Sequence, residues 1–409
     1  MSDSSSDQVL ELAVRSSYGK LLSFVAARAG GDLAAAEDAL SDAFVAALRQ
    51  WPIEGIPHKP EAWLLVTARR RLMDFQRRSA RSQIHAASLQ DSPSPGEHPA
   101  QSGEDFPDER LKLMFVCAHP AIDPAVRTPL MLQTVLGIEA ERIARAFLSS
   151  PTAMSQRLVR AKAKIRDAGI PFAVPEPAEW SERFRDVLDA IYAAFTTGWE
   201  DSPGIGVGSA DLSTEAVWLA RVIVDLLPAE PEALGLLALV LYCHARRAAR
   251  ICAGRFVPLP EQDTSLWDRS LIAEAESVLG RAAEKRQWGR FQLEAAIQSV
   301  HAQRAISGST DWAAIVSLYE GLTQCTAALG ARIGLAVALS QTCGAGCGLD
   351  ALDSLPTESL ANHQPYWAAR AHLLRNLGRT DEARKAYQRA SGLTSSPAIR
   401  EFLLGQLTG

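Results

Sequence analysis

Features that would place this chain in several other classes of protein are missing from its 409 residues. No apolar run reaches the roughly 18 residues that a membrane span requires, and no basic segment followed by an apolar one opens the chain as a secretory signal would. The 6 cysteines are sparse and irregularly spaced, which argues against a disulfide framework. We therefore expect a cytoplasmic protein with reduced cysteines and no membrane association.

The residue constellations of enzymes are missing as well. No Ser-His-Asp set, pair of catalytic carboxylates or metal triad stands out, so we expect no enzyme, no catalytic residue, no metal and no cofactor. Gly204, Gly206 and Gly208 resemble a phosphate-binding loop, but no strand pattern precedes them and a flexible loop is favoured. Cys325, Cys343 and Cys347 could hold a metal or sense oxidants, although no histidine cluster lies nearby.

The composition that remains is that of a globular protein. Apolar residues make up 47% and charged residues 22%, and the length predicts two or three domains. The net charge of −5 is uneven: residues 1–175 hold 21 Lys and Arg against 20 Asp and Glu, and residues 176–409 hold 21 against 27. Because the first half is not basic overall, any contact with nucleic acid must come from local clusters.

Apolar spacing predicts helices along almost the whole chain and no alternating strand pattern, so the expected fold class is all-α. One stretch rich in Ser, Pro and Gly, acidic from Gln90 to Pro107, reads as a linker between two helical segments. After Pro171 and Pro175 the chain becomes rich in Ala and Leu. The expected parts are 8–81, the linker 82–107, 108–172, and a C-terminal region 180–409.

The C-terminal region contains a weak internal repeat. The pattern Gly346 to Ala351 returns 32 residues later as Gly378 to Ala383, and residues 377–390 are similar to the second helix of a tetratricopeptide unit. Small residues at intervals along this helix would let paired helices approach closely, namely Ala383, Ala386 and Ala390. An irregular helical bundle with chance similarity is the alternative.

The first cationic cluster lies on a predicted helix that ends near Arg81. Between Ala62 and Arg81 there are six arginines and one acid. One face of this helix should be buried: Leu65, Ala68, Leu72 and Phe75. Another face could follow a phosphate backbone and offer a ring to an unpaired base: Trp63, Arg70, Asp74, Arg77 and Arg81. A solvated arginine face with a core tryptophan is the plainer interpretation.

The second cationic cluster predicts a helix-turn-helix. Ile143, Ala144 and Phe147 form the apolar face of its first helix, and Ser150 with Pro151 marks the start of the second. The second helix has its own apolar face: Met154, Leu158, Ala161 and Ile165. Five cations and no acid from Arg157 to Arg166 would supply affinity for DNA without regard to its sequence. Many basic helical hairpins, however, bind nothing.

Taken in order, these segments resemble the extracytoplasmic-function (ECF) sigma factors of the sigma-70 family. Residues 36–48 resemble the helix that docks on the polymerase clamp, residues 60–78 the segment that captures and melts the minus-ten element, and residues 127–166 sigma domain 4, which reads the minus-35 element. The resemblance implies a nonenzymatic factor with core RNA polymerase (clamp of β′, flap of β) and promoter DNA as partners.

The resemblance also implies roles for individual residues. Residues for core polymerase are Glu37, Asp38 and Asp42, on an exposed helix face, with Leu40, Phe44 and Leu48 packed inward. Residues for the minus-ten element are Trp63, Arg70, Asp74, Arg77, Arg78 and Arg81. Residues for the minus-35 element are Thr152, Ser155, Gln156, Arg157, Arg160 and Lys164. The loop 51–59 would receive a flipped base, and the acidic stretch 91–105 would follow the RNA exit path.

Further segments are similar to the ECF group that carries a long tetratricopeptide-like C-terminal extension: 108–120, 157–172, 231–239, 245–250, 262–268 and 310–312. The resemblance implies that this extension is regulatory and can bind a partner protein. Residues 192–199 and 341–347 depart from the group's pattern.

Two other functions remain open at this point. A one-component helix-turn-helix regulator could sense a ligand or a partner through its helical C-terminal region, and a helical-repeat scaffold could carry basic helices that bind nothing. The acidic helix 36–48 favours the sigma factor, because an operator-binding protein has no need of it.

Overall fold

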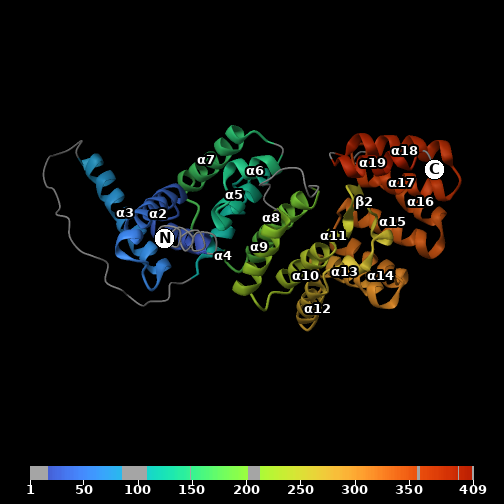
Figure 1. Cartoon of the computed structure of the whole chain (residues 1–409), viewed down its shortest axis with the longest axis horizontal. Coiled ribbons are helices and arrows are strands. Elements are labelled where there is room, and N and C mark those ends of the chain that lie inside the picture. The colour runs from blue at the N-terminus through green and yellow to red at the C-terminus, as the bar shows by residue number, and fades with distance from the viewer. Residues whose placement is uncertain are drawn as a thin grey trace. The chain divides into compact units, whose positions relative to one another are not determined.

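The computed structural model describes residues 17–84, 108–147, 149–200, 212–356, 360–394 and 396–407. The chain divides into two compact units, Met1–Ala194 and Phe195–Gly409. Nearly every described element is an α-helix, so the all-α prediction is confirmed (Figure 1). None of the helices in the described ranges combines the length and the apolar character that a membrane crossing needs.

The N-terminal unit is built from short helices that follow a first helix at 17–28. These are α2 (Leu33–Glu54), α3 (Pro60–Ile84), α4 (Arg110–Cys117), α5 (Pro124–Leu136), α6 (Ala140–Ala146), α7 (Pro151–Asp167) and most of α8 (Trp180–Glu200). Side-chain caps fix three of the starts: Asp32 accepts from Ala35 N, Asp123 from Ala125 N and Ser150 from Ala153 N.

Helix α8 begins at Trp180, where the C-terminal region was expected to begin, yet its residues up to Ala194 belong to the N-terminal unit. Trp180 and Phe184 stack on each other and lie against Phe115 of α4. Two polar contacts reinforce this packing. Arg183 donates to the Phe115 carbonyl at 2.9 Å, and Thr128 donates to the Ala190 carbonyl at 3.1 Å. A cut after residue 175 would therefore expose the core of this unit.

The C-terminal unit contains the end of α8 and the helices that follow it. They are α9 (Leu212–Leu226), α10 (Pro231–Ala245), α11 (Arg247–Arg250), α12 (Arg269–Ala283), α13 (Arg290–Ser307), α14 (Trp312–Cys325), α15 (Leu329–Cys343), α16 (Ala345–Asp353), α17 (Gln364–Asn376), α18 (Thr380–Leu393) and α19 (Pro397–Gly405). Helix α10 is apolar on almost every side and lies at the centre of this unit, packed against α9, α12 and α13.

A small hairpin interrupts the helices. Strands β1 (Ile251–Cys252) and β2 (Arg255–Phe256) pair in antiparallel register, Ile251 with Phe256. Both turn residues have positive φ, 49° at Ala253 and 78° at Gly254, which is the geometry of a tight hairpin turn. The short 3-10 turns η1 (Leu259–Glu261) and η2 (Thr264–Leu266) follow.

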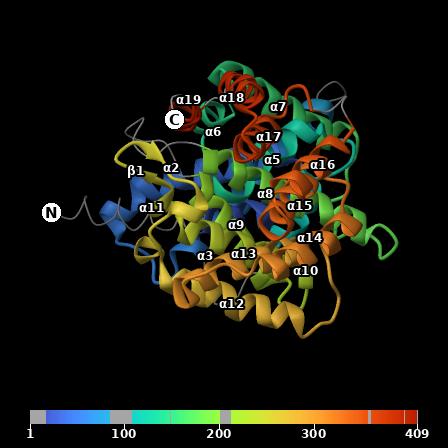
Figure 2. The same cartoon turned by 90° about the vertical axis from the view of Figure 1, so that its right-hand side faces the viewer.

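From α14 onward each helix packs mainly on its neighbours in the sequence, whereas α13 packs mainly on α10. Two apolar cores result, one shared by α13, α14 and α15 and the other by α15 to α19 with the segment before α17. Helices α17 and α18 lie side by side in both ribbon views (Figure 2). They are joined at Gly378, whose φ of 74° suits glycine, and Ala383, Ala386 and Ala390 are buried as predicted.

Two glycines in helices of this unit form a matched pair for a stability test. A Cβ on Gly235 of α10 would lie 2.6 Å from the backbone nitrogen of Gln292, whereas one on Gly280 of α12 would meet nothing within 4 Å. We expect Gly235→Ala to lower the free energy of unfolding by about 1–3 kcal/mol through overpacking. Gly280→Ala should raise it by about 1 kcal/mol through helix propensity. Urea denaturation of both variants checks this, and equal effects would contradict the close packing of α10 on α13.

Candidate nucleic-acid interface

Helices α6 and α7 form the predicted helical hairpin, and α7 starts where the sequence indicated. The Ser150 hydroxyl accepts from Ala153 N at 3.1 Å, and Pro151 occupies the first helical turn. The expected apolar face is buried in full: Met154, Leu158, Ala161 and Ile165. On α6, Ile143 and Ala144 are buried, and Phe147 just beyond it is half-buried.

All the residues predicted for the minus-35 element are exposed on α7: Thr152, Ser155, Gln156, Arg157, Arg160 and Lys164. The three cations among them border one hollow of about 290 Å³ on the surface of this unit, beside Ile122 and Val126. Asp123 is at the same hollow. Among the described residues, these three cations have no ion-pair partner, so the hollow is a place where an anionic oxygen would be attracted.

The other two cations of α7 are already occupied. Lys162 is buried and its ammonium contacts both oxygens of Glu37 on α2, at 2.6 and 2.5 Å. Arg166 pairs with Asp167 at 2.9 Å. The expectation that all five cations of this helix serve DNA is therefore wrong for Lys162, which lies beside the buried stripe of α7 and faces another helix instead.

On α2 the three predicted acids are placed differently from one another. Asp38 and Asp42 are exposed as expected, but Glu37 is half-buried against Lys162. Burial raises the pKa of Glu37, while the charge and hydrogen bond of Lys162 oppose that change. Burial therefore costs the carboxylate more than the ammonium returns, as is common for ion pairs removed from water.

The inward face of α2 is also shifted from the prediction. Leu40 is buried and Phe44 is half-buried, but Leu48 is 50% exposed, so its predicted burial is wrong. The buried stripe continues through Ala47 and Trp51 instead. Helix α2 also runs on to Glu54 with Pro52 inside it, so the loop expected at 51–59 is confined to residues 55–59.

Helix α3 carries the residues predicted for the minus-ten element. Leu65, Ala68 and Leu72 are buried as predicted, and Arg70, Asp74 and Arg77 are exposed. Trp63 is half-buried, with its ring 5.6 Å from that of Trp51 in an edge-on contact. Trp63 is thus partly covered by α2. The side chains of Phe75, Arg78 and Arg81 lie outside the described residues, as do residues 85–107 of the linker and Gly204 to Gly208.

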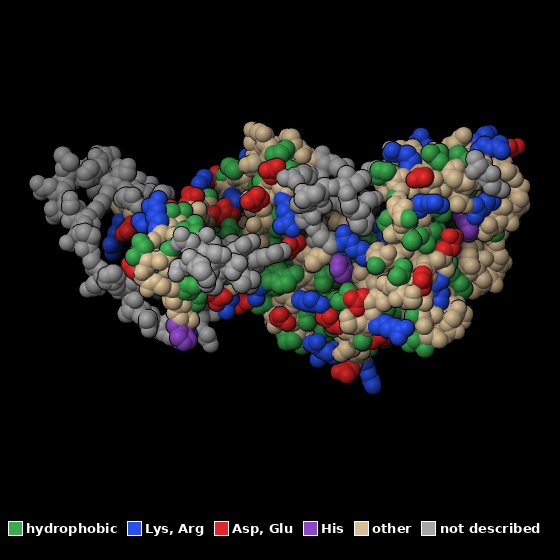
Figure 3. All heavy atoms as spheres, viewed as in Figure 1, with side chains coloured by type: hydrophobic (Ala, Val, Ile, Leu, Met, Phe, Trp, Pro, Cys, Tyr) green, Lys and Arg blue, Asp and Glu red, His purple; other side chains and the backbone are tan. Residues whose placement is uncertain are grey.

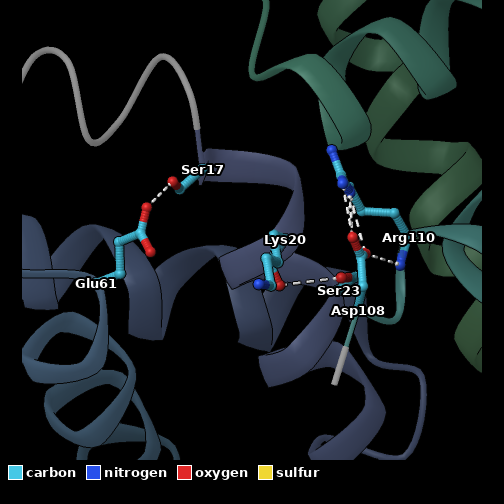
Figure 4. Close-up of polar contacts among 6 residues, drawn as sticks. All are labelled: Ser17, Lys20, Ser23, Glu61, Asp108 and Arg110. Atoms are coloured by element: carbon cyan, nitrogen blue, oxygen red, sulfur yellow. Dashed lines mark hydrogen bonds and ion pairs between the residues drawn. The ribbon is translucent and has the colours of Figure 1, made fainter. Parts of the chain in front are cut away.

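A hydrogen bond joins the first helix to the start of α3, and an ion pair lies at the start of α4 (Figure 4). The Ser17 hydroxyl donates to Glu61 in the first turn of α3. At the start of α4, Asp108 accepts from Arg110 at 2.6 and 3.0 Å. Burial works against the charge of Asp108, but the hydrogen bonds of Arg110 and the charges of Arg110 and Lys20 keep its pKa below the usual value.

The segments on either side of the linker also meet at close range. A Cβ on Gly19 would lie 2.0 Å from the Val135 carbonyl oxygen, and one on Gly137 would lie 2.9 Å from the Tyr18 ring. Gly137 has a φ of 68° and ends α5. Burial raises the pKa of Tyr18 strongly. The first helix and α2 therefore lie directly against α5 and α7.

The sequence did not reveal this contact between α2 and α7. One signal was available, because Lys162 follows Leu158 by four residues and thus lies at the edge of the apolar face of its helix. A lysine there is either half-solvated or paired, and no rule of spacing points to Glu37, 125 residues earlier.

The cysteines and histidines of the described ranges do not gather as metal ligands. No group of three or more potential metal ligands is present there, so a shared metal at Cys325, Cys343 and Cys347 is not supported. All three are exposed. Cys117, by contrast, is buried beside Thr134, and burial raises its pKa to about 12, so this thiol is a packing residue.

Comparison with known proteins gives two family matches. Residues 14–82, which hold the first helix, α2 and α3, match the family described as Sigma-70 region 2. Residues 183–283 match a family of unknown function, DUF6596. Over 377 residues the chain is 37% identical to an uncharacterized protein of Rhizobium meliloti (strain 1021), an overlap that covers 91% of this chain and 89% of that protein. No solved structure matches.

Region 2 is a domain of the sigma-70 family, so the match at residues 14–82 supports a sigma-70 family sigma factor with a role in transcription initiation. It also supports core RNA polymerase and promoter DNA as partners. A one-component regulator and a helical scaffold, the two alternatives, do not account for region 2.

The buried pair between α2 and α7 can be tested by a double-mutant cycle. Lys162→Met or Glu37→Leu alone should cost about 3 kcal/mol of unfolding free energy, because each leaves its partner charged and buried. The double variant should recover most of that loss, since neither charge then remains. Chemical denaturation of the four proteins measures the coupling. Additive losses would show that the two side chains do not interact.

Proposed function

We propose that this sigma factor is of the extracytoplasmic-function type, reads the minus-35 element with α7, captures and melts the minus-ten element with α3, and docks on core polymerase through α2 and the domain 108–172. The clamp of β′ and the flap of β are the proposed docking sites. One observation supports this most strongly: all six candidate residues of α7 are exposed above a fully buried apolar face.

Reading of the minus-35 element divides between two kinds of side chain. Thr152, Ser155 and Gln156 lie in the first turns of α7, where hydroxyl and amide groups can reach base edges in a major groove. Arg157, Arg160 and Lys164 gather around the hollow beside α5 and supply phosphate contacts that set the register.

Melting of the minus-ten element is assigned to α3 and the loop before it. Arg70 and Arg77 follow the backbone, Asp74 lies between them, and Trp63 offers its uncovered side to an unstacked base. Arg78 and Arg81 extend the same series in sequence. The loop 55–59 receives a flipped base, whose unstacking costs a few kcal/mol that the pocket must return.

Polymerase docking competes with the contact inside the protein. Asp38 and Asp42 are exposed and ready for a basic partner, but the Glu37 carboxylate is held by Lys162. Use of Glu37 by polymerase therefore requires α7 to leave α2.

The C-terminal unit is proposed as a tetratricopeptide-like regulatory extension that binds a partner protein. From α14 onward its helices pack mainly on their sequence neighbours, and α17 with α18 forms a pair joined at a glycine, as in such repeats. The face of this unit seen in Figure 3 mixes Lys and Arg with Asp and Glu, so it offers no basic stripe for DNA.

Charge reversal on α7 tests the DNA-reading role. Arg160→Glu should lower initiation by core polymerase at a promoter with both elements about tenfold or more, because a phosphate contact is replaced by a repulsion. Arg185→Glu is the matched control, since Arg185 is an exposed arginine of α8 outside both clusters. Multi-round transcription in vitro with mapping of start sites measures the effect, and circular dichroism verifies that both variants fold. Equal initiation by the two variants would show that α7 does not contact the promoter.

Truncation tests the regulatory extension. The cut belongs after Glu200, which keeps the part of α8 that packs on Phe115. We expect the shortened chain to bind core polymerase and to differ from the full chain in promoter activity, because the domains proposed for DNA and polymerase remain. Transcription assays with both chains at equal occupancy of polymerase make the comparison, and unchanged activity would refute a regulatory role.

A further inference from the structure

The C-terminal unit contains a hollow of about 600 Å³ that none of the proposed sigma functions uses. It is bordered by the segment after β2, the end of α13, and helices α15, α17, α18 and α19. Its volume falls within the range of roughly 300–1,000 Å³ that is usual for small-molecule sites. Its walls come from segments as far apart as Phe256 and Gln406, so the folded unit alone creates it.

Aromatic side chains form much of the wall. The rings of Phe256 and Phe402 meet edge to face with centroids 5.4 Å apart, which joins the hairpin to α19. Trp312 and Tyr387 line the same hollow, and Tyr387 is almost fully buried. Four rings around one space provide flat apolar surfaces against which a planar molecule can stack.

Two arginines at this hollow are held by neutral groups. Arg304 donates to the carbonyls of Leu259 at 2.9 Å and Gln262 at 3.0 Å, and also to that of Pro260. Burial, followed by the charge of Arg246, lowers the pKa of Arg304.

The second arginine is Arg375 of α17. It donates to the side-chain amide oxygen of Gln406 and lies 5.9 Å from the Tyr387 ring centroid. Neither Arg304 nor Arg375 has a carboxylate partner among the described residues. A cation with only neutral neighbours remains available to an anion.

The remaining titratable groups at the hollow do not cancel this charge. Burial, followed by the charge of Arg375, lowers the pKa of His372, and Glu261 opposes that change. The histidine is therefore neutral near pH 7. Glu261 is exposed, and it is the one acid in the lining. The lining therefore has two arginines and one exposed carboxylate, so the hollow has a net positive charge as well as aromatic walls.

We propose that this hollow is a binding site for a small organic carboxylate with a planar apolar body. The carboxylate lies toward Arg375 and Arg304, and the body lies between the aromatic rings. The lining comes from the hairpin segment and from helices α13, α14, α15, α17, α18 and α19. An occupant therefore joins these segments and stabilises the folded unit by an amount that rises with the logarithm of its concentration over its dissociation constant.

A pair of probes with one ring system and opposite charge tests the site in the full chain without polymerase. Indole-3-propionate should bind with a dissociation constant tighter than about 1 mM by isothermal titration calorimetry, and tryptamine should bind at least tenfold more weakly. Equal binding of both probes would indicate nonspecific apolar adsorption and refute the proposal. Absence of binding by indole-3-propionate would refute it as well.

Variants of residues in the lining test whether the probe binds at the hollow. Arg375→Gln should weaken indole-3-propionate at least tenfold, and Arg384→Gln should leave it unchanged, because Arg384 pairs with Asp381 on the exposed surface of α18. If Arg375→Gln fails to fold, Gln341→Glu replaces it. That exposed residue also lines the hollow, and its new charge should repel the carboxylate. Wild-type affinity in either folded variant would overturn the assignment.

Discussion

The contact of Lys162 with Glu37 constrains the arrangement of the N-terminal unit more than any other single interaction described for it. A buried ammonium cannot be left alone in a protein interior, and a carboxylate 125 residues earlier in the chain meets it. Burial raises the pKa of Glu37 and the charge of Lys162 opposes that change, so the carboxylate gives up hydration to make this contact. It fixes which faces of α2 and α7 meet, because apolar packing alone would allow neighbouring registers, whereas a buried charge accepts one partner.

Close backbone packing makes that pairing possible. Gly19 lies so near Val135, and Gly137 so near Tyr18, that any side chain at either glycine would push the helices apart. The glycine that ends α5 therefore has two functions. Its left-handed backbone stops the helix, and its missing side chain admits the tyrosine ring.

Much of this architecture could be predicted from the sequence because local rules dictate it. The Ser150 and Pro151 start of α7, its apolar stripe and the alanines of α18 follow from helical spacing and capping, and all are present in the structure. The prediction was wrong at Leu48, because the neighbouring residue Ala47 lies on the buried face of α2 in its place. It missed the Lys162 pairing and the hollow between the hairpin and α19, since both join segments far apart in the chain. The spacing of apolar residues does not predict contacts between segments that are far apart in the sequence.

The serial packing of the C-terminal unit has a consequence for how stability is distributed within it. Helices α14 to α19 pack mainly on their sequence neighbours, while α10 is enclosed by α9, α12 and α13. A chain assembled in this way can fray from α19 inward, helix by helix, without disturbing its centre. Backbone amides of α10 would then exchange with solvent only when the whole unit opens, and those of α18 and α19 would exchange far sooner. The unit thus has a protected centre at α10 and a less protected C-terminal end at α18 and α19.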